Sequence, residues 1–186
     1  LSSERLQLAY KSGIFPWFNP GEPILWWAPK LRMVLYFDEL VVSKSMRNIL
    51  NRNTFTITFN QKFREVISNC SLIKREGQGG TWISQEMIEA YCKLNELGIA
   101  KSVEVWQNDE LVGGLYGIDL GDVFCGESMF SKVSNASKVA FITLANKLKN
   151  ENYKLLDCQV YNEHLDSLGC REIDRDEFMK LLNSGS

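Results

Sequence analysis

The chain has 186 residues, of which 45% are hydrophobic and 24% are charged, and its formal net charge is −2 at pH 7. These proportions are typical of a globular protein, and they argue against a general nucleic-acid binder, which carries a large positive charge. Because no apolar run approaches 18 residues and the start of the chain lacks a basic, signal-like region, we expect no membrane span, no secretory signal and a cytoplasmic location.

The N-terminal residues are rich in aromatic side chains. Residues 1–12 are predicted to form the end of a helix that Gly13 terminates, and an aromatic segment at 15–21 ends in a turn. A short apolar stretch precedes Pro29. We therefore expect a small N-terminal domain over residues 1–33 and a larger domain over residues 34–186.

The larger domain mixes strand and helix patterns. Strands are predicted at 33–37, 54–59, 102–106, 111–118, 123–126 and 153–160, with a hairpin joining the third to the fourth. Helices are predicted at 43–50, after Asn60 as a capping residue, at 84–97, at 136–149, and after a capping box of Asp174 and Glu177. This order predicts an α/β protein with a mixed (α+β) sheet.

The cysteines and the histidine restrict the possible chemistry. Five cysteines, an odd number, have no C-x-x-C spacing, so we interpret them as reduced thiols that pack as small apolar side chains. His164 is the only histidine, which rules out a histidine-rich metal cluster. We predict no metal site, and we expect His164 to make a structural hydrogen bond rather than to act as a base.

Three polar residues interrupt core-like segments. Glu127 lies between Phe124 and Met129, and both Asp157 and Gln159 interrupt an apolar strand pattern. Burying such groups without partners costs roughly 2–7 kcal/mol. Residues two positions apart on a strand point to the same side, so Asp157 and Gln159 can face one site. The alternative is that all three make satisfied structural hydrogen bonds.

Basic residues are concentrated in one part of the chain. Residues 43–75 contain a single acidic residue, Glu65, and seven basic ones: Lys44, Arg47, Arg52, Lys62, Arg64, Lys74 and Arg75. Such a patch can contact a phosphate backbone, and the alternative is that two helices each carry a solvated basic face.

Several motifs resemble, in the same order, those of the bacterial leucyl/phenylalanyl-tRNA–protein transferases. Two of them are Gly126-Glu127-Ser128-Met129-Phe130-Ser131 and Asp157-Cys158-Gln159-Val160, and the others are residues 10–18, 23–27, 80–83, 102–106, 111–117 and 135–138. The similarity covers nearly the whole chain. Lys101 departs from the family, which usually has a histidine at this position.

The resemblance implies an enzyme that takes Leu or Phe, and less readily Met, from aminoacyl-tRNA. Such an enzyme joins the amino acid by a peptide bond to the N-terminal Lys or Arg of a protein and so marks that protein for degradation. The resemblance also implies that the larger domain is like the GCN5-related N-acetyltransferases. The reaction is aminolysis of an ester, which needs no metal and no cofactor, so the expected partners are charged tRNA and an acceptor protein.

The catalytic residues that the resemblance implies are Asp157, Gln159 and Glu127. In that scheme Asp157 polarises Gln159, whose side chain helps to take the proton from the attacking amine. Because a carboxamide is a very weak base, we expect Gln159 to hold the amine by a hydrogen bond while a substrate group such as the ribose 2′-hydroxyl relays the proton. Glu127 is predicted to bind the cationic acceptor, with a helix cap or a buried salt bridge as the alternative.

The resemblance also implies two regions that bind the donor. The aminoacyl side chain is expected in a tolerant apolar pocket lined by Leu115, Phe124, Met129, Phe141, Leu144 and Leu156. Phe141 and Leu144 fit a plain core equally well. Trp17 and Trp82 are predicted to stack on the tRNA 3′ adenosine, although Trp82 fits packing beneath a loop as well. With tRNA as donor, the seven basic residues become candidates for phosphate contacts.

Two other functions fit parts of the sequence. An acetyl-CoA-dependent N-acetyltransferase needs a Gly-rich pyrophosphate loop, which Arg75-x-x-Gln78-x-Gly80 resembles only loosely. A tRNA-end binding module without activity would not need Glu127, Asp157 and Gln159 together.

Overall fold

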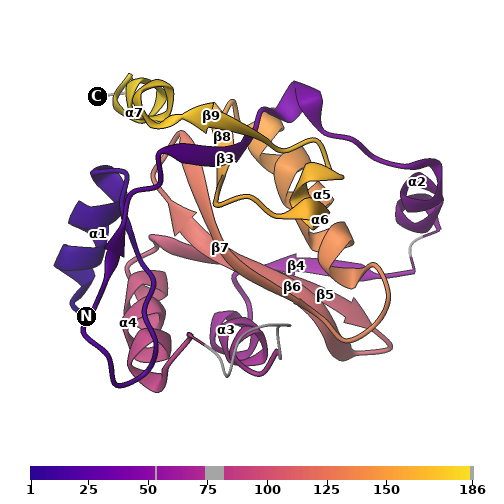
Figure 1. Ribbon diagram of the computed structural model, residues 1–186. Helices are drawn as coiled ribbons and strands as arrows, with labels where there is room; N and C mark the ends of the chain where they lie inside the picture. The colour runs from indigo at the N-terminus through magenta and orange to yellow at the C-terminus, as the bar shows by residue number, and fades with distance from the viewer. Residues whose placement is uncertain (53, 74–81, 185–186) are drawn as a thin grey trace.

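The structure, a computed structural model, describes residues 1–52, 54–73 and 82–184 (Figure 1). Its N-terminal part consists of α1 (Ser3–Lys11) and a two-stranded sheet of β1 (Phe15–Pro16) and β2 (Trp26–Trp27). The helix begins where it does because the hydroxyl of Ser2 accepts a hydrogen bond from the Arg5 N–H, which caps the first turn.

A seven-stranded sheet forms the centre of the protein. Its strands are β3 (Leu31–Leu35), β4 (Thr56–Phe59), β5 (Ala100–Gln107), β6 (Glu110–Asp119), β7 (Val123–Ser131), β8 (Leu155–Gln159) and β9 (Arg171–Asp174). Their spatial order is β4-β5-β6-β7-β8-β3-β9, and all neighbours are antiparallel except β7 and β8, which run parallel. The predicted α/β class with a mixed sheet is confirmed.

Helices cover both faces of this sheet (Figure 1). They are the short η1 (Phe37–Glu39), α2 (Lys44–Asn51), α3 (Phe63–Ser71), α4 (Gln85–Glu96), α5 (Ala136–Asn150), α6 (Glu163–Asp166) and α7 (Arg175–Asn183). The core has two layers. One contains α1, α3, α4 and Phe178 of α7, and the other contains α5 with Met46 of α2. Within the described residues, no helix is long and apolar enough to cross a membrane.

Most of the predicted elements are confirmed to within a few residues. The hairpin of β5 and β6 and the helices α4 and α5 lie where the patterns place them. Ser43 and Ser84 cap α2 and α4, because their hydroxyls accept hydrogen bonds from the N–H groups of Met46 and Met87.

The predicted cap at Asn60 is wrong. Its side chain accepts a hydrogen bond from the Ser102 N–H of β5 at 2.8 Å. The residue that caps α3 is Lys62, whose side chain makes no capping hydrogen bond. Glu104, a fully buried residue of β5, accepts the N–H groups of Gln61 and Lys62 and so holds the segment that leads into the helix.

Two further expectations near the chain's later elements need correction. Asp174 begins α7 without a side-chain cap, because it is also the last residue of β9, where it pairs with Leu31. The strand predicted to end at Gly126 continues to Ser131, so the whole Gly-Glu-Ser-Met-Phe-Ser motif lies on β7.

Candidate active site

The parallel strands β7 and β8 separate partway along their length. Their pairing runs from Val123 and Leu155 to Cys125 and Asp157 and ends there. Immediately beyond this point each strand contains a register shift against its antiparallel neighbour. Such bulges bend a strand and redirect its side chains. The edges that face each other across the resulting gap carry the polar residues singled out in the sequence.

Glu127 is the extra residue of the bulge in β7. On the neighbouring strand β6, Gly117 pairs with Gly126 and Tyr116 pairs with Ser128, so Glu127 has no opposite residue there. Glycine is required at Gly117, because a Cβ atom would lie 2.3 Å from a backbone carbonyl oxygen of β7. The local sequence therefore places the Glu127 carboxylate at the gap.

The bulge in β8 lies at Cys158. On β3, Met33 pairs with Gln159 and Val34 pairs with Asp157. Gln159 has a φ of +68°, in the left-handed region, which costs a non-glycine residue about 1–3 kcal/mol. The simple alternation that puts Asp157 and Gln159 on one side is therefore wrong: Gln159 lines a cavity, whereas Asp157 is fully buried behind it.

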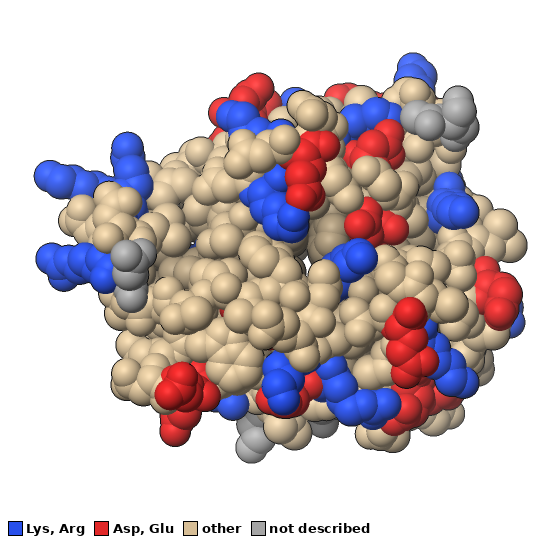
Figure 2. All heavy atoms as spheres, turned by 180° about the vertical axis from the view of Figure 1, so that it is seen from behind, with Lys and Arg blue, Asp and Glu red and all other residues tan. Residues whose placement is uncertain are grey.

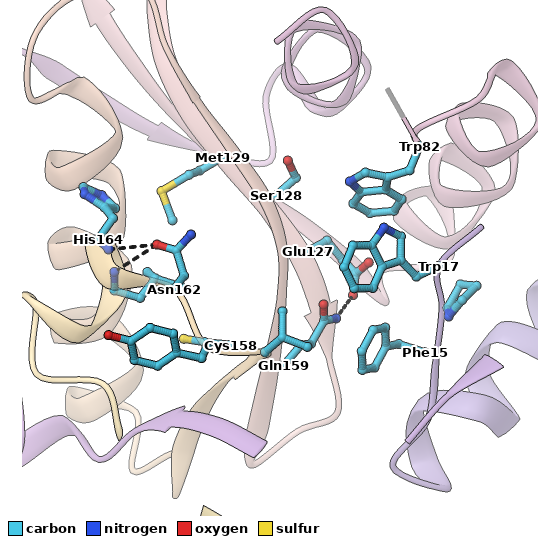
Figure 3. A pocket seen from close by; sticks show the side chains of 14 residues that line it. Phe15, Trp17, Trp82, Glu127, Ser128, Met129, Cys158, Gln159, Asn162 and His164 are labelled. Atoms are coloured by element: carbon cyan, nitrogen blue, oxygen red, sulfur yellow. Dashed lines mark hydrogen bonds between the residues drawn. The ribbon is translucent and has the colours of Figure 1, made fainter. Parts of the chain in front are cut away.

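Glu127 and Gln159 face each other across the gap (Figure 3). The side-chain amide of Gln159 donates from Nε2 to Oε1 of Glu127 at 2.6 Å. The hydroxyl of Tyr91 donates to Oε2 of Glu127 at 3.2 Å, and this hydroxyl also bonds to the hydroxyl of Tyr10. A chain of hydrogen bonds thus connects α1 and α4 to the two separating strands.

The environment of Glu127 changes its acidity. Burial raises the pKa of Glu127 from an ordinary 4.5 to about 7, although hydrogen bonds from Tyr10, Gln159 and Tyr91 lower it. Burial, followed by the charge of Glu127, raises the pKa of both tyrosines well above their usual value. Glu127 is therefore divided between its neutral and charged forms near pH 7, so a cation bound beside it would shift the balance toward the carboxylate.

Asp157 is held in a buried ion pair with Arg32 of β3. The guanidinium donates from Nε and Nη2 to the two carboxylate oxygens at 2.8 and 2.7 Å, and the two side chains are 2% and 0% exposed. Oδ1 of Asp157 also accepts the main-chain N–H of Gln159 at 2.9 Å. Burial lowers the pKa of Arg32, but the attraction of Asp157 outweighs it and the net shift is upward.

This ion pair changes how Asp157 relates to Gln159. The scheme implied by the resemblance has Asp157 polarise the side chain of Gln159. Within the described residues, Asp157 instead bonds to the main chain of Gln159, and the side chain of Gln159 bonds to Glu127.

Two adjoining cavities meet at Glu127. The outer cavity has a volume of about 390 Å³ and is lined by aromatic and polar side chains, among them Phe15 and Asn162. The inner cavity has a volume of about 80 Å³ and lies among apolar residues of β6, β7, β8 and α5. The residues that line both are Glu127, Ser128, Met129, Cys158 and Leu165.

The inner cavity brings together most of the predicted aminoacyl pocket. Five of the six predicted residues line it: Leu115, Met129, Phe141, Leu144 and Leu156. Phe124 is not among its lining residues and is only 2% exposed. The reason is its position on β7 ahead of the bulge, where the strand is still paired with β8 and the ring packs against Gly117.

Trp17 and Trp82 both line the outer cavity, on the side away from Met129 and His164 (Figure 3). The indole N–H of Trp27 donates to the carbonyl oxygen of Trp17 at 2.6 Å, which fixes this tryptophan on the β1–β2 sheet. Both tryptophans are half-buried, and aromatic rings that line a cavity suit stacking on a nucleobase.

Two residues discussed from the sequence lie at different distances from the site. His164 lines the outer cavity, and burial, with the nearby charge of Lys138, lowers its pKa. Lys101 lies on β5 opposite Gly117 and is not among the residues that line either cavity.

The basic residues predicted to form one patch over residues 43–75 lie on both faces of the sheet, as far as the structure describes them. Lys44 and Arg47 lie on α2, and Arg52 follows it, in the layer of α5. Lys62 and Arg64 lie at the start of α3, on the opposite face. The prediction of one basic patch is therefore wrong for the described residues, and Lys74 and Arg75 lie outside them.

The two basic groups also differ in their partners. Lys62 pairs with Glu65 at 2.9 Å, and Arg64 pairs with Glu89 at 2.8 Å. At the end of the molecule formed by α2, Lys and Arg side chains gather without acidic neighbours (Figure 2). Of these two groups, the one at α2 is thus the simpler electrostatic surface within the part of the chain that the structure describes.

Three residues of the site are not singled out by the sequence. Tyr10 and Tyr91 fit apolar helix positions, and their hydroxyls meet only because α1 packs on α4. Arg32 precedes a strand pattern and looks exposed. The one usable signal is that a carboxylate predicted to be buried, Asp157, requires a cation. Among the described residues, no group of three His, Cys, Asp or Glu side chains could hold a metal ion.

Comparisons with known proteins identify the family. The family model described as leucyl/phenylalanyl-tRNA protein transferase matches residues 34–183, and the model of its N-terminal domain matches residues 1–30. A relative from Flavobacterium johnsoniae, named leucyl/phenylalanyl-tRNA–protein transferase, is 78% identical over 99% of this chain and 87% of its own length. A relative of the same name from Christiangramia forsetii is 59% identical, over 98% of this chain and 87% of its own length.

Solved structures show similarity in fold. A conserved protein of unknown function from Bacteroides thetaiotaomicron aligns with a TM-score of 0.53 at 13% identity, over 82% of this chain and 55% of that one. A functionally unknown conserved protein from Staphylococcus epidermidis aligns with a TM-score of 0.53 at 10% identity, over 77% of this chain and 57% of that one. From the family models and the relatives, the chain belongs to the leucyl/phenylalanyl-tRNA–protein transferase family, whose members are aminoacyltransferases.

Proposed function

We propose that this enzyme transfers Leu or Phe, and less readily Met, from aminoacyl-tRNA to the N-terminal Lys or Arg of acceptor proteins in the cytoplasm, and so marks them for degradation. The observation that carries the proposal is the hydrogen bond between Glu127, which lines both cavities, and Gln159, which lines the outer one. A donor that extends through both cavities would bring its ester to this bond, and an acceptor amine would arrive at the same point.

The two cavities support the choice of donor. The inner cavity is small and mostly apolar, with Glu127 and Ser128 in the part of its wall that it shares with the outer cavity, which suits a Leu, Phe or Met side chain better than a charged one. Met129 gives its wall an adaptable side chain, in keeping with a tolerant specificity. The outer cavity offers the rings of Trp17 and Trp82 to the terminal adenosine of the tRNA.

The charges at the junction support a cationic acceptor. Glu127 is a carboxylate whose pKa of about 7 would fall as a Lys or Arg side chain or an α-ammonium group binds beside it. The acceptor would then lie beside this carboxylate and within reach of the side chain of Gln159, which can hold the attacking amine by a hydrogen bond.

The chemistry is aminolysis of an ester. The nitrogen of the acceptor amine attacks the aminoacyl carbonyl carbon, the new C–N bond forms, and the bond from that carbon to the ribose oxygen breaks. The proton lost by the amine ends on the ribose oxygen, relayed by a substrate group such as the 2′-hydroxyl. Because the ester is already activated, positioning can supply much of the acceleration, and we propose no metal and no cofactor.

A transfer assay tests this proposal. The protein is incubated with Phe-tRNA and with peptides that begin with Arg, Lys or Asp, and the products are analysed by mass spectrometry. We expect the Arg and Lys peptides to gain one Phe residue and the Asp peptide to remain unchanged. An acetylated Arg peptide, which lacks a free amine, is the control. Absence of extended product from both basic peptides would overturn the proposal.

A binding measurement separates this function from acetyl transfer. Puromycin, which imitates the end of an aminoacyl-tRNA, should raise the melting temperature of the protein, whereas CoA should not. The reverse result would favour an acetyl-CoA-dependent enzyme.

A further inference from the structure

Arg32 has an unusual place in the protein. It is the largest of the fully buried side chains, at 2% exposure, although it carries a permanent charge. Its guanidinium lies between two aromatic rings, 4.8 Å from the centre of Phe15 and 4.6 Å from the centre of Phe178. Nη1 donates to the carbonyl oxygen of Gly13 at 3.2 Å. Arg32 thus joins the N-terminal segment, the last helix and the sheet.

The remaining donors of Arg32 are directed at one carboxylate. Nε and Nη2 bond to Oδ1 and Oδ2 of Asp157, a two-point contact that fixes both the position and the plane of the carboxylate. Because both partners are buried, neither can turn to water without leaving the other uncompensated. The orientation of Asp157 is therefore set by Arg32.

Asp157 transmits this orientation to Gln159. The oxygen that receives Nε of Arg32, Oδ1, also accepts the main-chain N–H of Gln159 at 2.9 Å. This bond holds a residue whose backbone is in the left-handed region, and the same residue reaches Glu127 with its side chain. Without a fixed acceptor for its main-chain N–H, the backbone of Gln159 would relax from its left-handed conformation. The side-chain amide of Gln159 would then no longer point at Glu127.

We propose that Arg32 is a positioning residue for aminoacyl transfer, which acts through Asp157 to hold the turn at Gln159 and so directs the Gln159 side chain at Glu127. This inference rests on the proposed role of Gln159 in the reaction. In this inference Asp157 holds the main chain of Gln159 in place. Arg32, which lies 125 positions before Asp157 in the sequence, belongs to the same hydrogen-bonded unit.

Arg32→Lys is the first test, because lysine keeps the charge but replaces the planar two-point contact by a single ammonium group. We expect kcat for transfer from Phe-tRNA to an Arg-initiated peptide to fall at least tenfold while KM for Phe-tRNA changes less than twofold. Ile118→Val, a change in a fully buried residue of β6 that lines neither cavity, is the control for a general loss of stability. It should leave kcat within twofold of the wild type.

A spectroscopic measurement on the free protein tests the positioning itself. The side-chain amide resonance of Gln159, assigned by comparison with Gln159→Ala, should move toward the position of an unbonded amide in Arg32→Lys and stay in place in Ile118→Val. Asp157→Asn should move it as well, and the double variant Arg32→Lys/Asp157→Asn should lose no more kcat than the more severe single variant, within threefold.

Several results would overturn the inference. An unmoved Gln159 resonance in folded Arg32→Lys, or a kcat equal to that of Ile118→Val, would show that Arg32 only stabilises the fold. If Arg32→Lys does not fold, Phe178→Leu replaces it, since it removes one ring from the guanidinium, and an unmoved resonance there overturns the proposal equally. Failure of the wild type to transfer would contradict the proposed function, while the resonance would still test the positioning.

Discussion

The side-chain amide of Gln159 and the carboxylate of Glu127 are 2.6 Å apart, across the gap that opens where β7 and β8 cease to pair. Each residue reaches this position through an irregularity of its own strand, a bulge at Glu127 and a left-handed backbone at Gln159. Two local departures from regular strand geometry thus create one polar contact between an apolar cavity and an aromatic one.

The stability of the protein should respond to the titration of Glu127. Its pKa is about 7 in the folded protein and about 4.5 when unfolded, so between these values only the folded state retains the proton. The free energy of unfolding should therefore fall as the pH rises from 4.5 to 7 and then level off. Relative to the wild type, Glu127→Gln should gain about 3 kcal/mol over this range, since one pKa unit corresponds to about 1.4 kcal/mol.

Urea unfolding at several pH values measures this difference. Glu110→Gln, which changes an exposed residue at the start of β6, is the control and should keep the pH dependence of the wild type. A constant difference between the wild type and Glu127→Gln from pH 4.5 to 8 would show that Glu127 titrates normally.

Removing the hydroxyl of Tyr91 should raise the pKa of Glu127 further. The hydrogen bond from Tyr91 to Oε2 favours the charged carboxylate, and a bond of this kind contributes about 1 kcal/mol, or roughly 0.7 pH units. In Tyr91→Phe, the midpoint of the pH–rate profile for transfer should move to higher pH by about that amount. Tyr153→Phe, which removes a hydroxyl bonded to the distant Asp119, should leave it unchanged. Equal midpoints in both variants would contradict the assigned contact.

Shortening Met129 should change the preference among donors. Met129 lines both cavities, so Met129→Ala enlarges the inner one and favours the larger aminoacyl side chain. We expect the ratio of kcat/KM for Phe-tRNA over Leu-tRNA to rise by about tenfold, the scale on which pockets discriminate small differences in size. Leu148→Ala, a change at a buried residue of α5 that does not line the inner cavity, should lower the stability of the protein without altering this ratio. An unchanged ratio in Met129→Ala would place the side chain of the donor elsewhere.

The cations on and just after α2, which form no ion pair among the described residues, should contribute more to tRNA binding than those at the start of α3. Replacing Lys44, Arg47 and Arg52 by Ala should reduce the slope of log affinity against log salt by about two, since each lost phosphate contact removes roughly 0.7–0.9. Replacing Lys62 and Arg64, which pair with Glu65 and Glu89, should change the slope by less than one. Filter binding of Phe-tRNA at several salt concentrations compares the two variants. Equal slopes would indicate that neither helix is favoured.

The sequence predicts which residues form the site better than it predicts how they are arranged. Glu127, Asp157 and Gln159 stand out because they interrupt apolar patterns, and the inner cavity collects five of six predicted pocket residues. The bulge at Glu127 is not predictable from β7 alone, because it depends on which residues of β6 lie opposite. The expected alternation of side chains along β8 fails for Asp157 and Gln159 for the same reason, because the bulge between them depends on which residues of β3 lie opposite.

Contacts between residues that are distant in the sequence could not be predicted from the sequence either. Arg32 and Asp157 meet because β3 inserts between β8 and β9, a neighbour relationship that no local pattern encodes. The basic residues of α2 and α3 lie in one stretch of the sequence, and the packing of these helices on opposite faces of the sheet separates them. Local patterns therefore identify polar residues that need partners, and the topology decides who those partners are.

The most direct measurement is the single-turnover rate of transfer from saturating Phe-tRNA to an Arg-initiated peptide, in the wild type, Glu127→Gln and Gln159→Ala. We expect both variants to bind Phe-tRNA within threefold of the wild type but to transfer at least tenfold more slowly, with the loss in Glu127→Gln largest for basic acceptors. Wild-type rates in both variants would contradict the claim that donor and acceptor meet at this pair.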